Sequence, residues 1–132
     1  MIIKDIRIKD IALLKNELKM LDYIIKERVN IEQYWLFKLK VYSAKHNKSE
    51  IEKYIKRNYG YQKMLFDYYD TRVHIICNSL DKLNDNDLGY IYDMLIYPIK
   101  IKEIIKKYQL TSDSHCYRKL DSLLKFMTKG VR

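Results

Sequence analysis

Residues 101–120 read IKEIIKKYQLTSDSHCYRKL, and this stretch decides how the C-terminal part of the chain folds. Its apolar residues recur at helical spacing on either side of a polar cluster, TSDS at 111–114. A Ser or Thr hydroxyl that precedes a helix accepts a hydrogen bond from a backbone N–H two or three residues later. The stretch therefore predicts a short helix, a polar turn and a second helix that is capped by Thr111 or Ser112.

The two helices on either side of this turn are predicted to have distinct buried and outward faces. In the first helix we expect Ile101, Ile104, Ile105 and Tyr108 to be buried, and in the second Cys116, Leu120, Leu123, Leu124 and Met127. Leu110 is expected to fill the turn with its apolar side chain. The outward side chains are then rich in Lys, Arg, Ser, His and Tyr, which gives this region a basic surface that can donate hydrogen bonds.

A third helix is predicted directly upstream, from about Asp87 to Tyr97, with its N-cap in the run NDND at 84–87. Pro98 ends this helix, because the residue before a proline avoids the α conformation. Residues 84–132 therefore form a trihelical unit whose last two helices have the order of a helix-turn-helix motif. A helix-turn-helix motif places the first turns of its second helix in the major groove of DNA.

The first 83 residues are also predicted to be helical. Apolar residues at 11, 14, 18, 21 and 25 follow steps of three and four and predict one long helix that packs on another. The segment IEQYWLFKLKVYSA, residues 31–44, is apolar almost all round and is expected to be well buried. Ser49 and Glu52 have capping-box spacing and predict the next helix, NYG at 58–60 predicts its end, and a further helix covers 61–83. The fold class expected is all-α.

The charge of the chain suits an anionic partner. The net charge is +9, and residues 99–132 alone carry nine Lys or Arg against three Asp or Glu. A basic segment of this kind suits a surface that binds phosphate. Lysines also cover ordinary solvated helices, so the charge alone leaves both interpretations open.

Several other classes of protein are disfavoured by the sequence. No apolar run reaches the roughly 20 residues of a membrane span, and the start MIIKDIRIKD lacks the apolar core of a signal peptide. Cys77 and Cys116 stand far apart, so we expect a reduced, cytoplasmic protein in which both are small core residues. The sequence has no glycine-rich phosphate loop, no nucleophile or metalloprotease motif and no pair of His or Cys at metal-ligand spacing. We therefore expect no enzyme activity, no cofactor and no metal site.

Residues 83–127, LNDNDLGYIYDMLIYPIKIKEIIKKYQLTSDSHCYRKLDSLLKFM, resemble sigma-factor region 4. More closely, this segment is similar to the C-terminal part of small phage transcriptional regulators of the RinA, ArpU and LtrC kind. Two departures from the family pattern stand out. Ile105 occupies a position where a small residue is common, and the turn is one residue longer and contains Asp113.

The resemblance implies a transcriptional regulator that binds double-stranded DNA in the cytoplasm of a host cell and activates late or packaging genes of a phage. Residues 1–83 would then serve as a region for homodimerisation or for contact with host RNA polymerase, and residues 84–132 as the DNA-binding unit. Lysines are expected to hold phosphates, and the start of the last helix is expected to read sequence, with Arg able to donate two bonds to one guanine. The DNA-binding residues expected are Lys100, Lys102, Lys106, Lys107, Thr111, Ser112, Ser114, His115, Tyr117, Arg118 and Lys119.

Other interpretations of the same residues remain open. The chain is alternatively a phage-encoded inhibitor or adaptor that binds a host polymerase subunit or a nuclease through the same surface. A third interpretation is a DNA-binding packaging component similar to a small terminase subunit, which would assemble into a ring. The trihelical unit is also compatible with an ordinary helical bundle, because short helices with polar turns are common.

Overall fold

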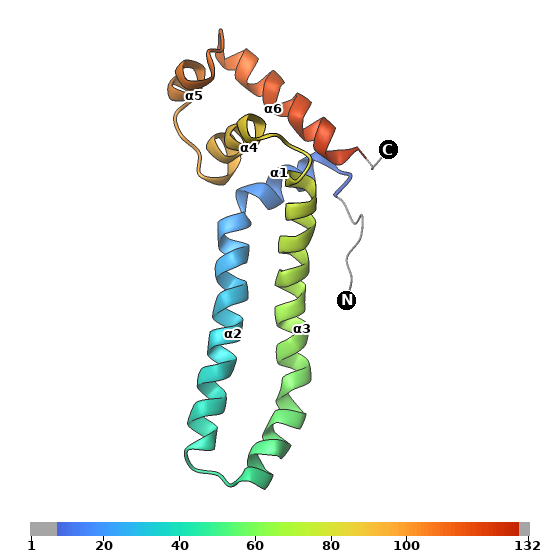
Figure 1. The fold of residues 1–132 in the computed structure, drawn as a ribbon, viewed down its shortest axis with the longest axis vertical. Coiled ribbons are helices and arrows are strands. Elements are labelled where there is room, and N and C mark those ends of the chain that lie inside the picture. Colours follow the sequence, from blue (N-terminus) through green and yellow to red (C-terminus); the bar gives the residue numbers. More distant parts are fainter. Residues whose placement is uncertain (1–7, 130–132) are drawn as a thin grey trace. The chain divides into compact units, whose positions relative to one another are not determined.

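The computed structural model describes residues 8–129, and in this range the chain is helical and contains no β-strand, as expected for the all-α class. The elements are α1 (Ile11–Lys19), α2 (Leu21–Ser43), α3 (Lys48–Leu80), α4 (Asp85–Ile91), a π-helical turn η1 (Tyr92–Ile96), α5 (Ile101–Tyr108) and α6 (Asp113–Thr128) (Figure 1). Within the same residues, none of the helices has both the length and the apolar content that crossing a membrane requires.

The helices form two compact units. One is the hairpin of residues 23–73, and the other consists of the described parts of residues 1–22 and 74–132. The second unit includes α1, which packs against α6 and η1. The boundary that we drew at residue 84 is therefore not where the compact units divide, because α1 supplies Leu14 and Leu18 to the buried interior beside the C-terminal helices.

The predicted long first helix is in fact two helices. α1 begins at the N-cap Asp10, whose carboxylate accepts a hydrogen bond from the Leu13 N–H at 3.0 Å, and it ends at Met20. Met20 has φ −96° and ψ 2°, and its N–H bonds to carbonyls three and four residues back. The apolar pattern runs across this break without interruption, so the periodicity of apolar residues could not reveal it.

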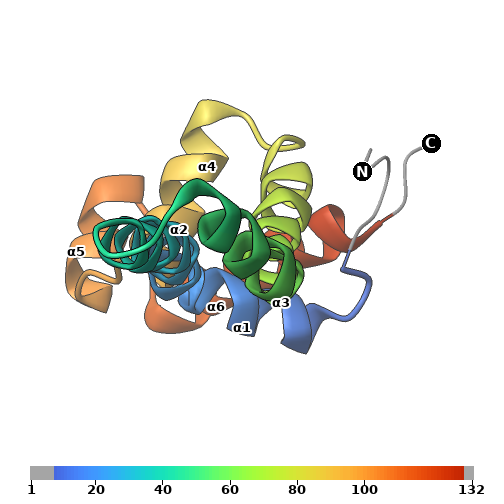
Figure 2. The same cartoon turned by 90° about the horizontal axis from the view of Figure 1, so that it is seen from below.

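The hairpin is made by α2 and the greater part of α3, which run antiparallel and side by side in both views (Figure 1, Figure 2). Trp35 stacks on Tyr54 with 6.1 Å between ring centroids, and Tyr42 stacks on Tyr54 at 4.1 Å. Nearer the other end, Gln62 donates to the Ile31 carbonyl at 2.5 Å. These contacts fix which residues of the two helices lie at the same level.

Two predictions about α3 were wrong. Its N-terminus is capped by Asn47 and Glu50 rather than by Ser49 and Glu52: each side chain accepts a hydrogen bond from the other residue's backbone N–H, at 3.0 and 2.9 Å. The helix also continues through Gly60 to Leu80 instead of ending there. Glycine lowers helix propensity but does not by itself stop a helix whose inward stripe continues on both sides.

The prediction that residues 31–44 are well buried was also wrong. Trp35 is buried, but Tyr34, Leu36, Phe37 and Val41 are each more than half exposed in the single chain. The physical reason is that a hairpin of two helices covers only one stripe of each helix. Cys77, expected in the core, is exposed as well, whereas Cys116 is buried as predicted.

The other unit has a continuous apolar interior. Its fully or almost fully buried members are Leu14, Leu18, Ile76, Tyr90, Ile91, Leu95, Ile104, Cys116, Leu120, Leu124 and Met127. They come from α1, the end of α3, α4, η1, α5 and α6. The Tyr97 hydroxyl also bonds to the Asp22 carboxylate, and the Lys82 ammonium bonds to the Lys129 carbonyl, so each bond joins residues that are far apart in the sequence. This interior holds α5 and α6 in place.

Candidate nucleic-acid interface

The polar break predicted after Tyr108 is present. α5 ends where Gln109 adopts a left-handed conformation, with φ 55° and ψ 48°. The Leu110 N–H then bonds back to the Ile105 carbonyl at 2.9 Å, which closes the end of the helix. Residues 109–112 therefore turn the chain, and residues 101–128 are two helices rather than one rod (Figure 1).

α6 starts with a side-chain cap of the kind that the sequence predicted. The Ser112 hydroxyl accepts a hydrogen bond from the His115 N–H at 3.1 Å. His115 in turn folds back over the turn, so that its Nδ1 accepts from the Thr111 N–H at 3.3 Å and lies 3.1 Å from the Thr111 hydroxyl. The side chains of Ser112, His115 and Thr111 thus stabilise the turn.

The rest of α6 separates into the two faces that the pattern predicted. Cys116, Leu120, Leu124 and Met127 are buried, whereas Ser114, Tyr117 and Arg118 are exposed. Arg118 lies on the side opposite the buried stripe, because it is two residues from both Cys116 and Leu120 along a 3.6-residue helix. The helix therefore presents Ser114 and Arg118 directly outward and Tyr117 at the edge of the same face.

A shallow depression extends this face further along α6. It is lined by Tyr117, Arg118, Asp121, Ser122 and Lys125. The Lys125 ammonium lies 3.0 Å from the Asp121 carboxylate, so one positive charge is partly offset here. Ser122 and Lys125 were not among the predicted contact residues, although their spacing of four and seven residues from Arg118 could have identified them.

The lysines around α5 are not equivalent. Lys100, Lys102 and Lys106 are exposed, and none of them has a carboxylate within 4.0 Å among residues 8–129. Lys107 differs because its ammonium lies 2.7 Å from the Asp93 carboxylate. Lys119 on α6 is half-buried, lies 5.1 Å from the centre of the Tyr90 ring, and is 4.0 Å from the Asp87 carboxylate.

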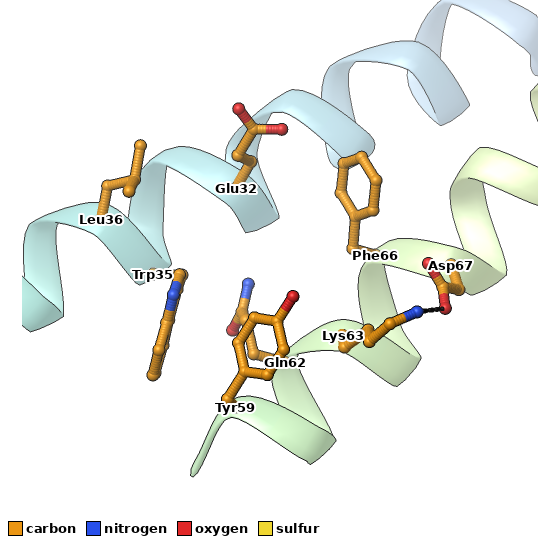
Figure 3. A pocket seen from close by; sticks show the side chains of 8 residues that line it. All are labelled: Glu32, Trp35, Leu36, Tyr59, Gln62, Lys63, Phe66 and Asp67. Atoms are coloured by element: carbon orange, nitrogen blue, oxygen red, sulfur yellow. Dashed lines mark hydrogen bonds and ion pairs between the residues drawn. The ribbon is translucent and has the colours of Figure 1, made fainter. Parts of the chain in front are cut away.

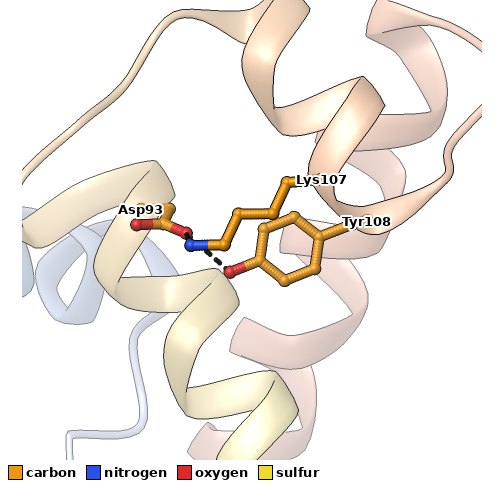
Figure 4. Close-up of polar contacts among 3 residues, drawn as sticks. All are labelled: Asp93, Lys107 and Tyr108. Atoms are coloured by element: carbon orange, nitrogen blue, oxygen red, sulfur yellow. Dashed lines mark hydrogen bonds and ion pairs between the residues drawn. The ribbon is translucent and has the colours of Figure 1, made fainter.

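Asp93 is the centre of a polar cluster that the sequence analysis missed (Figure 4). This buried carboxylate accepts hydrogen bonds on one oxygen from the Lys107 ammonium, at 2.7 Å, and from the Tyr108 hydroxyl, at 2.6 Å. Burial by itself would raise the pKa of Asp93, but the bonds from Lys107 and Tyr108 outweigh it and lower the pKa below 3.8. The carboxylate therefore stays charged and holds the end of α5 against η1.

Tyr90 continues this cluster toward α6. Its ring is fully buried and meets the Tyr108 ring edge to face, with 4.9 Å between centroids. Its hydroxyl donates to the Cys116 carbonyl at 2.7 Å. Burial is the main reason why the pKa values of Tyr90 and Tyr108 are both raised above 10.0. Two neutral tyrosines and one carboxylate thus join α4, η1, α5 and α6.

The hairpin has a hollow of its own, with a volume of about 410 Å³. It is lined by Glu32, Trp35, Leu36, Tyr59, Gln62, Lys63, Phe66 and Asp67 (Figure 3). Lys63 donates to the Asp67 carboxylate at 2.6 Å, which raises the pKa of Lys63. The hollow is open and largely apolar, and it contains no base placed next to a nucleophile. Among residues 8–129 no group of three His, Cys, Asp or Glu side chains is arranged to hold a metal ion.

Comparisons with known proteins give no further identification. No protein-family model, no curated protein and no solved structure matches this chain.

Proposed function

We propose that this chain is a sequence-specific regulator that binds double-stranded DNA through α5, the turn and α6. The observation that carries this proposal is the break at 109–112, followed by a capped helix whose outward face starts with Ser114, Tyr117 and Arg118. A firmly held helix with an exposed Arg in its second turn has the chemistry needed to read base edges in a major groove. The resemblance to small phage regulators supports the narrower proposal of a transcriptional activator of late or packaging genes.

The surroundings of each side chain suggest a division of roles. Lys100, Lys102 and Lys106 are available to neutralise phosphates, whereas the charge of Lys107 is already offset by Asp93. Ser112, Thr111 and His115 are engaged in the turn, so we assign them to shaping α6 rather than to reading bases. Lys119 is half-buried against Tyr90 and is expected to add little. Arg118, Tyr117 and Ser114 are then the residues that select sequence.

The first test is a selection of genomic fragments from the DNA that encodes the chain, followed by footprinting. We expect one sequence to be enriched and its affinity to fall steeply with salt, because bound phosphates release counterions. Arg118→Ala should weaken binding to the selected site by roughly 10- to 100-fold and leave binding to unrelated duplex nearly unchanged. Lys102→Ala should weaken both and reduce the slope of log affinity against log salt by about 1.

The matched control is Lys56→Ala, since Lys56 is an exposed cation on a helix of the other compact unit. It should leave both affinities unchanged. If no sequence is enriched, or if Arg118→Ala behaves like Lys56→Ala, the DNA proposal is wrong. Binding of a purified polymerase subunit or nuclease without any DNA preference would instead support an inhibitor or adaptor, and a ring-shaped oligomer on a packaging sequence would support a terminase-like component.

A further inference from the structure

The hairpin of residues 23–73 has too little interior to account for its apolar residues. In this unit only Ile24, Trp35 and Val73 are buried, although both helices carry many large apolar side chains. A unit of this size with a single helix–helix seam is usually stabilised by a disulfide, a metal or association with another chain. The described residues provide no disulfide and no metal site, so association with another chain is the remaining means of stabilisation among these three.

The residues that face the partner helix identify the two sides of the hairpin. Trp35 and Gln62 make contacts across the seam. The residues directly after them, Leu36 and Lys63, line the hollow on one side (Figure 3). The residues directly before them, Tyr34 and Tyr61, lie on the opposite side, because each step along a helix turns by about 100°. We call this opposite side the tyrosine face.

The tyrosine face carries exposed apolar side chains on both helices, with the polar Glu27 and Asn30 between Tyr23 and Tyr34. On α2 it contains Tyr34, Phe37 and Val41 in steps of three and four, with Tyr23 at the other end; on α3 it contains Tyr61, Met64 and Tyr68 in the same steps. All seven side chains are 50–65% exposed. Steps of three and four on two antiparallel helices are the pattern that packs against a second helical layer.

The exposed area matches what a stable dimer requires. A large aromatic side chain buries 150–250 Å² when fully covered, so seven half-exposed side chains offer on the order of 700–900 Å² per chain. A standard protein–protein interface buries about 800 Å² on each partner. The tyrosine face is therefore large enough for a specific interface, and a second copy of the same face has the matching length and apolar character.

The distribution of charge selects the orientation of the two copies. Residues 38–57, at the connection between the helices, carry seven Lys or Arg and two Asp or Glu, for a net charge of +5. The remaining residues of the hairpin, 23–37 and 58–73, carry four of each sign. A parallel pair would bring two strongly basic ends together, whereas an antiparallel pair places each basic end beside a neutral one.

We propose that the tyrosine face binds the tyrosine face of a second copy of this chain in antiparallel orientation, which forms a four-helix bundle. Tyr61 lies near the two-fold axis, because it is at the level of Ile31, about half-way between Tyr23 and Val41. Val41 of each copy then lies near Tyr23 of the other copy, because a two-fold axis that reverses the helix direction places α2 against α2. This inference stands on the hairpin alone and does not depend on DNA binding.

The first experiment is sedimentation equilibrium of the full chain. The unmodified chain should have twice the mass of 16.1 kDa. The double variant Phe37→Asp with Met64→Asp should be monomeric, since it buries four carboxylates per dimer. The matched control is Leu36→Asp, at a residue that is 56% exposed on the other side of the hairpin, and it should remain dimeric. A monomeric unmodified chain, or equal behaviour of the two variants, would overturn the proposal.

The second experiment avoids variants that could fail to fold. In a Cys77→Ser background, mild oxidation should cross-link Tyr61→Cys to itself and should cross-link a chain that carries both Val41→Cys and Tyr23→Cys. Val41→Cys alone should not cross-link, because its copies lie at opposite ends of an antiparallel bundle. Efficient cross-linking of Val41→Cys alone would show a parallel pair and overturn the proposed orientation. Both readouts are independent of whether any DNA sequence is bound.

Discussion

The Tyr108 hydroxyl donates a 2.6 Å hydrogen bond to the Asp93 carboxylate and so joins the last turn of α5 to η1. Asp93 is only 6% exposed, and its other hydrogen-bond donor is Lys107. Tyr108→Phe keeps the ring but leaves a buried charge with one partner fewer. We expect this variant to lower the free energy of unfolding by about 1.5–3 kcal/mol, measured in urea. Tyr117→Phe, at an exposed position, is the control and should change it by less than about 0.5 kcal/mol.

The stability of this unit should fall at alkaline pH. Burial raises the pKa of Tyr90 and of Tyr108 above 10.0, and the bond to Asp93 raises the pKa of Tyr108 further. A raised pKa means that the folded chain keeps the proton after the unfolded chain has lost it. The stability is therefore complete below pH 10 and is lost as the pH rises above it. Urea midpoints measured between about pH 8 and 11 should show this decline, and the decline should be shallower in Tyr108→Phe.

The sequence predicted local features of the site well. The cap by Ser112, the break before it and the inward stripe of α6 depend on residues within a few positions of one another. Asp93 could not be recognised in the same way, because its partners lie 14 and 15 residues further along the chain. Before the fold is known, an Asp in a helical pattern is expected on the surface. The polar cluster therefore appears only when η1 and α5 are placed together.

The hairpin shows what a sequence pattern cannot predict. Periodicity shows that a helix has an apolar stripe, but it does not show how many neighbouring helices are present to cover it. Tyr34 and Phe37 were expected inside and are exposed, because this unit of a single chain has only one neighbouring helix to offer. Gly60 was expected to end a helix and does not, since the apolar residues that face α2 continue on either side of it.

Gly60→Ala should stabilise the hairpin. Gly60 lies inside α3, and a Cβ atom at this position would meet no atom within 4 Å other than those of its chain neighbours and of the backbone of its own helix. Alanine restricts the unfolded chain and adds no clash, so we expect the free energy of unfolding to rise by about 0.5–1 kcal/mol. Thermal unfolding followed by circular dichroism at 222 nm measures the change. A lower midpoint for this variant would show that residue 60 is not in an open helical position.

Ser112→Ala should destabilise the start of α6. The Ser112 hydroxyl is the cap that satisfies the His115 N–H, and alanine cannot replace it. Losing an N-cap of this kind costs about 1 kcal/mol. Ser114→Ala is the matched control, because Ser114 is exposed within the first turn of the same helix. Equal urea midpoints for the two variants would contradict the assignment of the cap to Ser112.

Gln109→Gly should stabilise the turn between α5 and α6. Gln109 is the only non-glycine residue with positive φ among residues 8–129, and a side chain in this left-handed conformation costs about 1–2 kcal/mol. Glycine adopts it without strain but is also more flexible when unfolded, so the expected net gain is about 0.5–1 kcal/mol. Gln109→Ala keeps the strain and should give no gain. If alanine stabilised the chain as much as glycine does, α5 would have to continue through residue 109, and the separation of α6 from α5 would be lost.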